Sequence, residues 1–514
     1  MASHRPNILL LFTDQQRYDT IAALGNPIIR TPAFDRLCHE GVAFTRCYTP
    51  SPVCVPGRAA MVTGLPPHRN GCFDNGFPVD PSLPSFMDKL TDQGYQTHGV
   101  GKMHFTPDSK RMWGFASREF SEEMGGQADD FRKCIDAHGY EHVDDRHGVR
   151  GEMYYIPQVS QLPAHLHETH WVADRSIHFL QQRDRDRPFF LWSSFIKPHP
   201  PFENPTPWNK LYRTPEMDAP FRPEGFDKLH TFWNHVQNRY KYRDHGYDEL
   251  LMRTIRAAYY ACISFIDHNV GRILDALGDE LDNTLVLLTS DHGELLGDYG
   301  CVGKRSMLDA AARVPMLVRF PGGASGGARG GARAGQRCEK PVSLLDVWPT
   351  ALTAAGADAP TVCDEGADLA AIADGHAQRD VVYSQFQHGG LALYMAATQH
   401  EKYIYSAPDE REWYFDLQRD PHETRDLAAN PQFRNRVDAM RTRLIERFKA
   451  DGYDEPLDGD TWRRFGQRRV EPNTDRGLLF QDNAITQQRI NALGPYARNI
   501  EADLDAMRDL IDHG

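Results

Sequence analysis

The sequence predicts an α/β fold, in which a large mixed sheet is sandwiched by helices and followed by a small C-terminal α+β subdomain with an antiparallel sheet. Three observations support this prediction. About the first 350 residues alternate apolar runs with helical patterns, the apolar runs are nearly continuous, and after about residue 378 short strands follow one another closely. Continuous apolar strands separated by helices are typical of a sheet covered on both faces.

The elements of the large sheet and its helices can be placed in chain order. Near-continuous apolar runs predict strands over residues 7–13, 189–195, 284–290 and 314–320. Helical periodicity predicts helices over residues 83–93, 172–182, 250–277 and 344–355. The helix over 250–277 is the longest and most periodic, so we expect it to pack against the sheet.

The C-terminal part has a different pattern. Short strands are predicted over 381–386, 391–398, 402–405 and 413–417, with a helix near 430–450. We therefore divide the chain into a catalytic α/β domain (1–377), a small antiparallel-sheet subdomain (378–455) and a polar C-terminal arm (456–514). The arm either packs against another subunit or is a weakly ordered tail, and we expect it to mediate self-association into a dimer or tetramer. Residues 321–336 are rich in Gly and predict a flexible surface loop.

Composition limits the classes of function. The chain has 514 residues and a formal net charge of −13, which argues against nucleic acid or an anionic membrane as the main partner. The longest N-terminal apolar run, Ile8–Phe12, is too short to span a membrane. Nine cysteines are scattered without a C-x-x-C pair, which predicts free thiols in a reducing, cytoplasmic compartment.

Two predicted strands end in acidic residues. Asp14 and Gln15 follow the first strand, and Asp291 and His292 follow the strand over 284–290. In open α/β sheets the ligand crevice lies at the carboxyl ends of the strands. Two strand ends that place carboxylates at one edge favour a metal site there, although a single strand-end carboxylate often only makes a turn.

The most informative motif is C-x-P-x-R at Cys54, Pro56 and Arg58, followed by small apolar residues that begin a helix. Taken alone, the cysteine could be a small buried apolar residue and the proline a residue of a first helical turn. Yet the motif resembles the signature of the type I sulfatases, in which the cysteine is oxidised to formylglycine. Further segments resemble that family in the same order: 6–19, 31–37, 94–104, 198–202, 290–294 with Lys304, and 413–427.

The resemblance implies a fold like that of alkaline phosphatase and a hydrolase for organic sulfate monoesters. A hydroxyl of the hydrated formylglycine attacks sulfur, and the other hydroxyl later expels sulfate. The implied partners are a small anionic ester and a formylglycine-generating enzyme for maturation. The chain resembles in particular the arylsulfatase, choline sulfatase and phosphonate monoester hydrolase branches of the alkaline phosphatase superfamily.

The resemblance also assigns residue roles. One divalent metal would be bound by Asp14, Gln15, Cys54, Asp291 and His292. Arg58 lies one helical turn beyond Cys54 and would hold the diol. Lys102 and Lys304 would bind the non-reacting sulfuryl oxygens. His199, together with Lys304, would protonate the departing alcohol or stabilise its oxygen. His104 would take the proton that releases sulfate, and Asn75 would contact substrate, although its Asp-Asn-Gly context is first a turn signal.

Two positions depart from the commonest family pattern. Gln15 stands where many sulfatases have Asp, and His292 where many have Asn. This ligand set widens the choice of metal from Ca²⁺ toward Mn²⁺. The close alternative is a phosphonate monoester or phosphodiester hydrolase of the same superfamily, and a third possibility is a non-catalytic metal-binding homologue with an unmodified Cys54. The alcohol part of the substrate depends on loops around 110–170 and 203–245, which carry no recognisable code.

Overall fold

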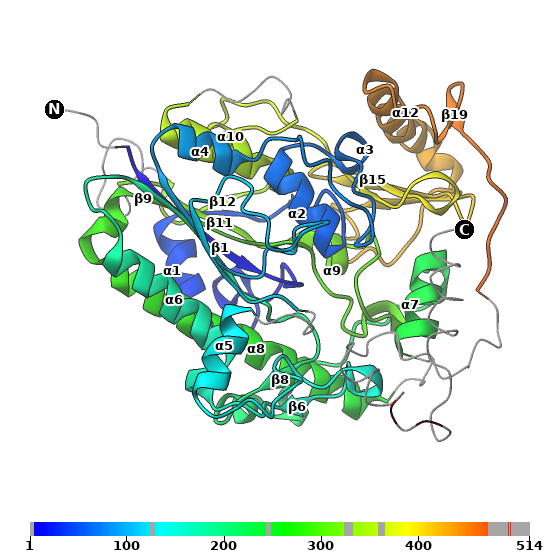
Figure 1. The fold of residues 1–514 in the computed structure, drawn as a ribbon. Coiled ribbons are helices and arrows are strands. Elements are labelled where there is room, and N and C mark those ends of the chain that lie inside the picture. The colour runs from blue at the N-terminus through cyan, green and yellow to red at the C-terminus, as the bar shows by residue number, and fades with distance from the viewer. Residues whose placement is uncertain are drawn as a thin grey trace.

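The computed structural model describes residues 5–123, 129–242, 248–322, 333–357 and 365–470, together with residues 492 and 494. Its centre is an eight-stranded mixed sheet (Figure 1). In spatial order the strands are β12 (Gln336–Cys338), β2 (Val42–Phe44), β11 (Met316–Arg319), β9 (Thr284–Ser290), β1 (Asn7–Thr13), β7 (Phe189–Ser194), β4 (Gln96–Gly101) and β5 (Ser117–Phe120). Strand β11 runs antiparallel to both of its neighbours, and the five strands from β9 to β5 are parallel.

Strands β1 and β9 form the middle of the sheet, and every residue in both is buried. They pair in parallel from Asn7 opposite Thr284 to Thr13 opposite Ser290. This register brings Asp14 and Asp291, the next residues in each strand, to the same edge of the sheet. The predicted α/β sheet is therefore confirmed, and so is the convergence of its two acidic strand ends.

Helices cover both faces of the sheet. One face carries α1 (Pro32–Glu40), α6 (Glu168–Gln182) and α8 (Glu249–Leu277), and the other carries α2 (Cys54–Thr63), α4 (Phe86–Asp92) and α10 (Val347–Ala355) (Figure 1). Side chains of β1 alternate between these two cores, with Leu9 facing the first and Leu10 the second. Each such leucine contributes about 1.5–3 kcal/mol by complete burial, so the strand is held from both sides.

One predicted strand is divided. The expected strand over 314–320 forms two pieces, β10 (Arg313–Val314) and β11, which pair with different sheets. Pro315 lies between them and has no N–H to donate to a ladder, which explains the interruption.

Three predicted helix starts also shift. Helix α4 begins at Phe86 because Ser85 and Asp88 form a capping box. Helix α6 begins earlier than predicted, where the His167 side chain accepts from Thr169 N. A 3₁₀ turn over Leu344–Asp346 precedes α10.

The C-terminal subdomain is the predicted antiparallel sheet. Its strands are β14 (Val382–Phe386), β15 (Leu393–Ala397), β16 (Glu401–Ser406) and β17 (Arg411–Asp416). Helix α12 (Arg434–Ala450) covers one face of this sheet, and the other face packs on the catalytic half (Figure 1). The smaller elements are α3 (Pro67–Asn70), α5 (Asp130–Ala137), α7 (Phe232–Tyr242), α9 (Asp309–Ala312), α11 (Leu369–Ala373), β3 (Cys47–Tyr48), β6 (Gln158–Val159), β8 (Glu203–Asn204), β13 (Val342–Ser343), β18 (Leu457–Asp458) and β19 (Thr461–Trp462).

Parts of the predicted loop and arm lie outside the described residues. Of the loop over 321–336, residues 323–332 are outside the description, and Gln336 already begins β12. Of the arm over 456–514, the description covers 456–470 and two isolated residues. The eight cysteines within the described ranges are all free thiols. Among the helices of those same ranges, none combines the length and hydropathy needed to cross a bilayer.

Candidate active site

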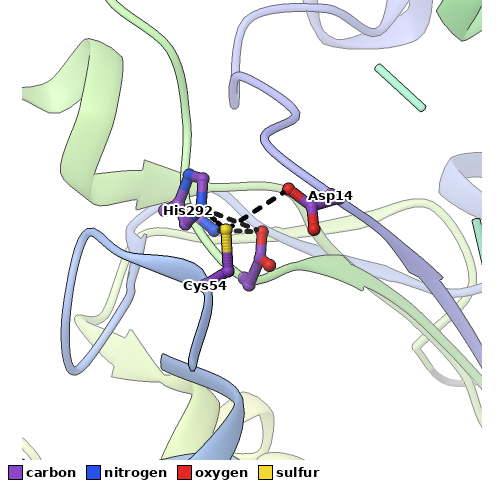
Figure 2. A group of neighbouring side chains, drawn as sticks. Asp14, Cys54 and His292 are labelled. Carbon is purple, nitrogen blue, oxygen red and sulfur yellow. Dashed lines mark hydrogen bonds and ion pairs between the residues drawn. The ribbon is translucent and has the colours of Figure 1, made fainter. Parts of the chain in front are cut away.

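Cys54 lies at the first position of α2, beside Asp14 and His292, which follow β1 and β9 (Figure 2). Its Sγ lies 2.6 Å from Lys304 Nζ, 3.2 Å from His292 Nε2 and 3.7 Å from Asp14 Oδ1. The close approach of α2 depends on Gly57, where an added Cβ would lie 3.0 Å from Ser51 O and 3.2 Å from Asp291 O. Pro56 falls in the first turn, where no N–H is required. The C-x-P-x-R motif therefore brings its cysteine to the acidic strand ends.

The Cys54 side chain has a strongly cationic environment. Burial raises the pKa of its thiol, but Lys304, His292 and Lys102 and a hydrogen bond from His104 outweigh burial and lower that pKa well below its usual value. A side chain at this position is thus surrounded by groups that favour negative charge. A cysteine that only fills space in a hydrophobic core would instead have an apolar environment.

Arg58 joins the two strand ends. Its guanidinium donates to Asp291 Oδ2 at 2.8 Å, to Asp14 Oδ2 at 3.0 Å and to Lys102 O at 2.6 Å. All three side chains are at most 1% exposed. The planar fork of arginine suits this bridging role. In this structure Arg58 holds the two carboxylates as well as lying one turn from Cys54.

Lys102 lies at the end of β4 and pairs with Asp14. Its Nζ is 2.7 Å from Asp14 Oδ2, and the lysine side chain is completely buried. Burial and the nearby Cys54 sulfur raise the pKa of Asp14, but Lys102, His199 and Arg58 prevail and lower it to about 2. The carboxylate is therefore ionised throughout the physiological range.

Four of the five predicted metal ligands form a compact donor group. One ligand atom from each of Asp14, Cys54, Asp291 and His292 lies within 4.8 Å of the others, and all four residues are buried. His292 Nδ1 lies 3.0 Å from Gly293 O, which accepts its proton and leaves the lone pair of Nε2 facing Cys54. Such a set of oxygen and nitrogen donors fits a divalent cation.

Gln15, the fifth predicted ligand, is oriented by a hydrogen bond. Its Nε2 donates to Glu294 Oε2, while its Oε1 is buried and has no hydrogen-bond partner within the described residues. Gln15 also has a φ of 68°, a left-handed conformation that is unusual for a non-glycine residue. An orphaned buried amide oxygen beside two carboxylates is what a cation would satisfy, so the residues present fit the metal.

The predicted histidines and Asn75 surround the same cysteine. His104 follows β4 and is one of the groups that lower the pKa of the Cys54 thiol. His199 Nδ1 lies 2.7 Å from Pro200 O, and its Nε2 lies 3.5 Å from the Tyr154 hydroxyl. Burial lowers the pKa of His199 to about 4 although nearby carboxylates raise it. Asn75 Oδ1 accepts from Val55 N at 3.1 Å, which fixes its amide beside the first turn of α2.

Several residues near the site carry no sequence signal of their own. Glu123 lies between Lys102 and His199, and Arg150 pairs with it. Gln237 of α7 accepts from Lys304 N at 2.9 Å and so positions that lysine. These residues come from the two loop regions flagged as substrate loops, but only the tertiary structure identifies the individual side chains.

The loop that carries His292 is supported from the C-terminal subdomain. Gly293 N and Glu294 N donate to Ala311 O and Ala310 O of α9, at 2.7 and 2.8 Å. An added Cβ at Gly293 would lie 2.1 Å from Ala310 O, so this contact requires glycine. Asp309 of the same helix pairs with Lys402 of β16, which also pairs with Glu423 at 2.5 Å. A buried ion cluster thus links the small sheet to the His292 loop.

Comparison with known proteins agrees with this geometry. The sulfatase family model matches residues 6–357, and a model described as N-sulphoglucosamine sulphohydrolase, C-terminal, matches residues 297–450. The chain is 28% identical to an arylsulfatase of Clostridium perfringens over 88% of this chain and 96% of that protein. It is 30% identical to a multifunctional alkaline phosphatase superfamily protein of Trinickia caryophylli, over 84% of this chain and 92% of that protein.

Among solved structures, the phosphonate monoester hydrolase of Agrobacterium radiobacter superposes with a TM-score of 0.76 and 25% identity, covering 87% of this chain and 96% of that one. The family model extends over well more than half of the chain and includes both acidic strand ends, Cys54 and Lys304. The chain is therefore a member of the sulfatase family of hydrolases, within the alkaline phosphatase superfamily.

Proposed function

We propose that this chain hydrolyses organic sulfate monoesters, with residue 54 as formylglycine and one bound divalent metal. The observation that carries the proposal is the position of Cys54, within 3.7 Å of Lys304, His292 and Asp14 at the joined tips of β1 and β9. A nucleophile at this point lies beside both the cations and the candidate metal ligands.

The reaction would need two groups that unmodified side chains do not provide, a hydrated aldehyde at residue 54 and a divalent cation. As a hydrated aldehyde, residue 54 would supply one hydroxyl that attacks sulfur and a second that lets sulfate leave as the aldehyde returns. A divalent cation held by Asp14, Gln15, Asp291 and His292 would supply positive charge beside residue 54 and lower the pKa of a hydroxyl there.

The remaining roles belong to side chains already present. Lys102 and Lys304 would bind the non-reacting sulfuryl oxygens, where negative charge spreads in the transition state. His104, which lowers the pKa of the Cys54 thiol, would take the proton of the second hydroxyl. Lys304 and His199 would stabilise the departing alcohol oxygen. Asn75 would hold a substrate oxygen beside the first turn of α2.

The metal is proposed to be Ca²⁺ or Mn²⁺. The nitrogen of His292 and the neutral amide of Gln15 leave only two carboxylates in the donor set, which favours Mn²⁺ more than an all-oxygen shell would. Elemental analysis of the purified protein, before and after chelation and reloading, would distinguish the two ions.

A second activity, hydrolysis of phosphonate monoesters or phosphodiesters, is favoured by one observation. Gln15 replaces a carboxylate, which leaves the site one unit more positive and suits phosphorus esters, whose transition states carry more negative charge. Gln15→Asp would place a third carboxylate near Asp14 and Asp291, and would also lose the donor to Glu294. It should lower the phosphonate rate more than the sulfate rate, and equal effects on both would contradict this reasoning.

The decisive experiment uses protein produced together with a formylglycine-generating enzyme. Mass spectrometry of the peptide that contains residue 54 measures the aldehyde, and a panel of sulfate, phosphonate and phosphate esters measures turnover. Sulfate-ester hydrolysis that scales with aldehyde content, and is absent in Cys54→Ala, supports the proposal. A thiol that remains unmodified in the native host, without turnover, would support a non-catalytic metal-binding homologue instead.

A further inference from the structure

Glu123 is a buried carboxylate inside the proposed substrate site. Its Oε2 lies 2.6 Å from Lys102 Nζ, and its Oε1 lies 2.9 Å from an Arg150 nitrogen and 3.4 Å from His199 Nδ1. The side chain is only 8% exposed. Burial raises the pKa of Glu123, but His199, Lys102 and Arg150 outweigh burial and hold it well below its usual value. The charged groups around Glu123 therefore keep it ionised.

This carboxylate changes the charge that Lys102 presents to a ligand. Lys102 Nζ lies between two carboxylates, Asp14 at 2.7 Å and Glu123 at 2.6 Å. Asp14 also belongs to the candidate metal group, where a cation would compensate it. Glu123 has no part in that group and lies on the side of Lys102 toward His199. Its negative charge thus faces the place where the non-reacting oxygens of a substrate would bind.

The candidate substrates differ in charge at that place. Sulfate monoesters, phosphonate monoesters and phosphodiesters each carry one negative charge on the transferred group. A phosphate monoester carries close to two above a pH of about 6, because its second ionisation occurs there. A fixed carboxylate next to the oxygen-binding lysine repels each negative charge of the substrate, so it disfavours a dianion about twice as strongly as a monoanion.

We propose that Glu123 is the residue that selects for charge: it restricts the site to esters whose transferred group is a monoanion and rejects dianionic phosphate monoesters. This inference rests on the proposed function and deepens it by naming the substrate class. The juxtaposition of Glu123, Lys102 and His199 carries it. An oxygen held by Lys102 would lie roughly 5 Å from the Glu123 carboxylate, where one extra charge at an effective dielectric constant of about 20 costs a factor of roughly 300. The Arg150 guanidinium paired with Glu123 reduces this factor.

The test compares Glu123→Gln with wild type on three esters that share one leaving group: p-nitrophenyl sulfate, p-nitrophenyl phenylphosphonate and p-nitrophenyl phosphate. Rates are divided by the aldehyde content of each preparation. We expect the ratio of kcat/KM for phosphate to kcat/KM for sulfate to rise by about 10- to 100-fold at pH 8, with little change in the phosphonate-to-sulfate ratio.

Glu122→Gln is the matched control. Glu122 is the neighbouring residue, and its carboxylate accepts hydrogen bonds from the backbone N–H groups of Met103 and His104. Its carboxylate does not pair with Lys102, which pairs with Glu123. It should leave both ratios unchanged. Glu123→Asp, which retains the charge, should also keep the wild-type ratios even if its overall rate falls.

Wild type provides a measurement that does not depend on any variant. If only the monoanion is accepted, kcat/KM for the phosphate ester should fall about tenfold per pH unit above pH 6, relative to the sulfate ester. The charged neighbours of Glu123 in this range are Lys102 and Arg150, which act on both esters alike. His199, whose pKa is lowered to about 4, is neutral throughout this range.

Two outcomes would overturn the inference, and they differ from each other. An equal loss on all three esters in Glu123→Gln would mean that Glu123 only positions Lys102, and the proposed sulfatase activity would stand. A fully aldehyde-bearing wild type that turns over none of the esters would remove the proposed function and the charge selection with it.

Discussion

Replacing Arg58 by Met tests whether one guanidinium holds the two strand ends together. Methionine retains much of the length of the side chain and its contact with the Phe12 ring, over which the guanidinium carbon lies at 4.8 Å. The change removes the ion pairs to Asp14 and Asp291, both of which are completely buried. Removing one partner of a buried pair typically costs about 3–5 kcal/mol, because the remaining charge is uncompensated.

Here a single substitution leaves two carboxylates without this partner and also removes the donor to Lys102 O. We therefore expect a loss near the upper end, about 4–5 kcal/mol, against a total stability of about 5–15 kcal/mol for a typical protein. Arg58→Lys retains the charge but cannot fork to both carboxylates, so it should lose about half as much.

The assay is urea unfolding of the metal-free protein in a chelator, followed by the same titration with saturating Mn²⁺. The ion brings positive charge to the same carboxylates, so it should recover part of the loss in Arg58→Met and stabilise this variant more than wild type. An unchanged unfolding midpoint for Arg58→Met in the chelator would refute the reasoning, since it would show that the two carboxylates do not depend on this cation.

Three further predictions concern other residues. Lys304→Met should lower kcat/KM for sulfate esters by about 10²–10³, and a series of leaving groups should show the largest loss for the least acidic alcohols; a uniform loss would exclude a role at the leaving oxygen. Burial raises the pKa of Asp267 to about 7, so this group stabilises the fold at low pH and loses that contribution as pH rises from about 4 toward 7. Between pH 5 and pH 8, Asp267→Asn should therefore lose less stability in urea unfolding than wild type does, by about 2–3 kcal/mol. Identical pH profiles for the two proteins would contradict the raised pKa. Lys402→Met should lower the free energy of unfolding by about 3–5 kcal/mol because Asp309 and Glu423 lose their buried cation. Adding Glu423→Gln to this variant should recover part of the loss in the same urea measurement. If nothing is recovered, the charge of Glu423 is not the cause of the loss.

The sequence was most informative where local pattern and chemistry coincide. Continuous apolar runs identified β1 and β9, and the residues that follow these runs placed Asp14 and Asp291 at one edge. The Cys54 motif could be read because its first helical turn is local. Element boundaries were less accurate where a short-range signal was overlooked, as with the capping box at Ser85 and the break at Pro315.

Contacts made between distant segments could not be predicted from local pattern. Glu123 reaches Lys102 from a loop without any motif, and the charge that it brings depends entirely on that approach. Arg58 was expected to hold the side chain at position 54, whereas its bridging of two carboxylates depends on the register of the strands beneath it. Such side chains are ordinary surface charges in a linear sequence, and only burial reveals their roles.

The buried ion pair between Lys402 and Asp309 of α9 has a consequence for engineering. The backbone carbonyls of α9 fix the turn that aims His292, and the cation that anchors α9 is contributed by the small sheet. A truncated enzyme ending near residue 377 would consequently lack the anchor of its own reaction centre. Chimeras that exchange the small sheet between relatives should transplant position 402 and position 309 as a matched set.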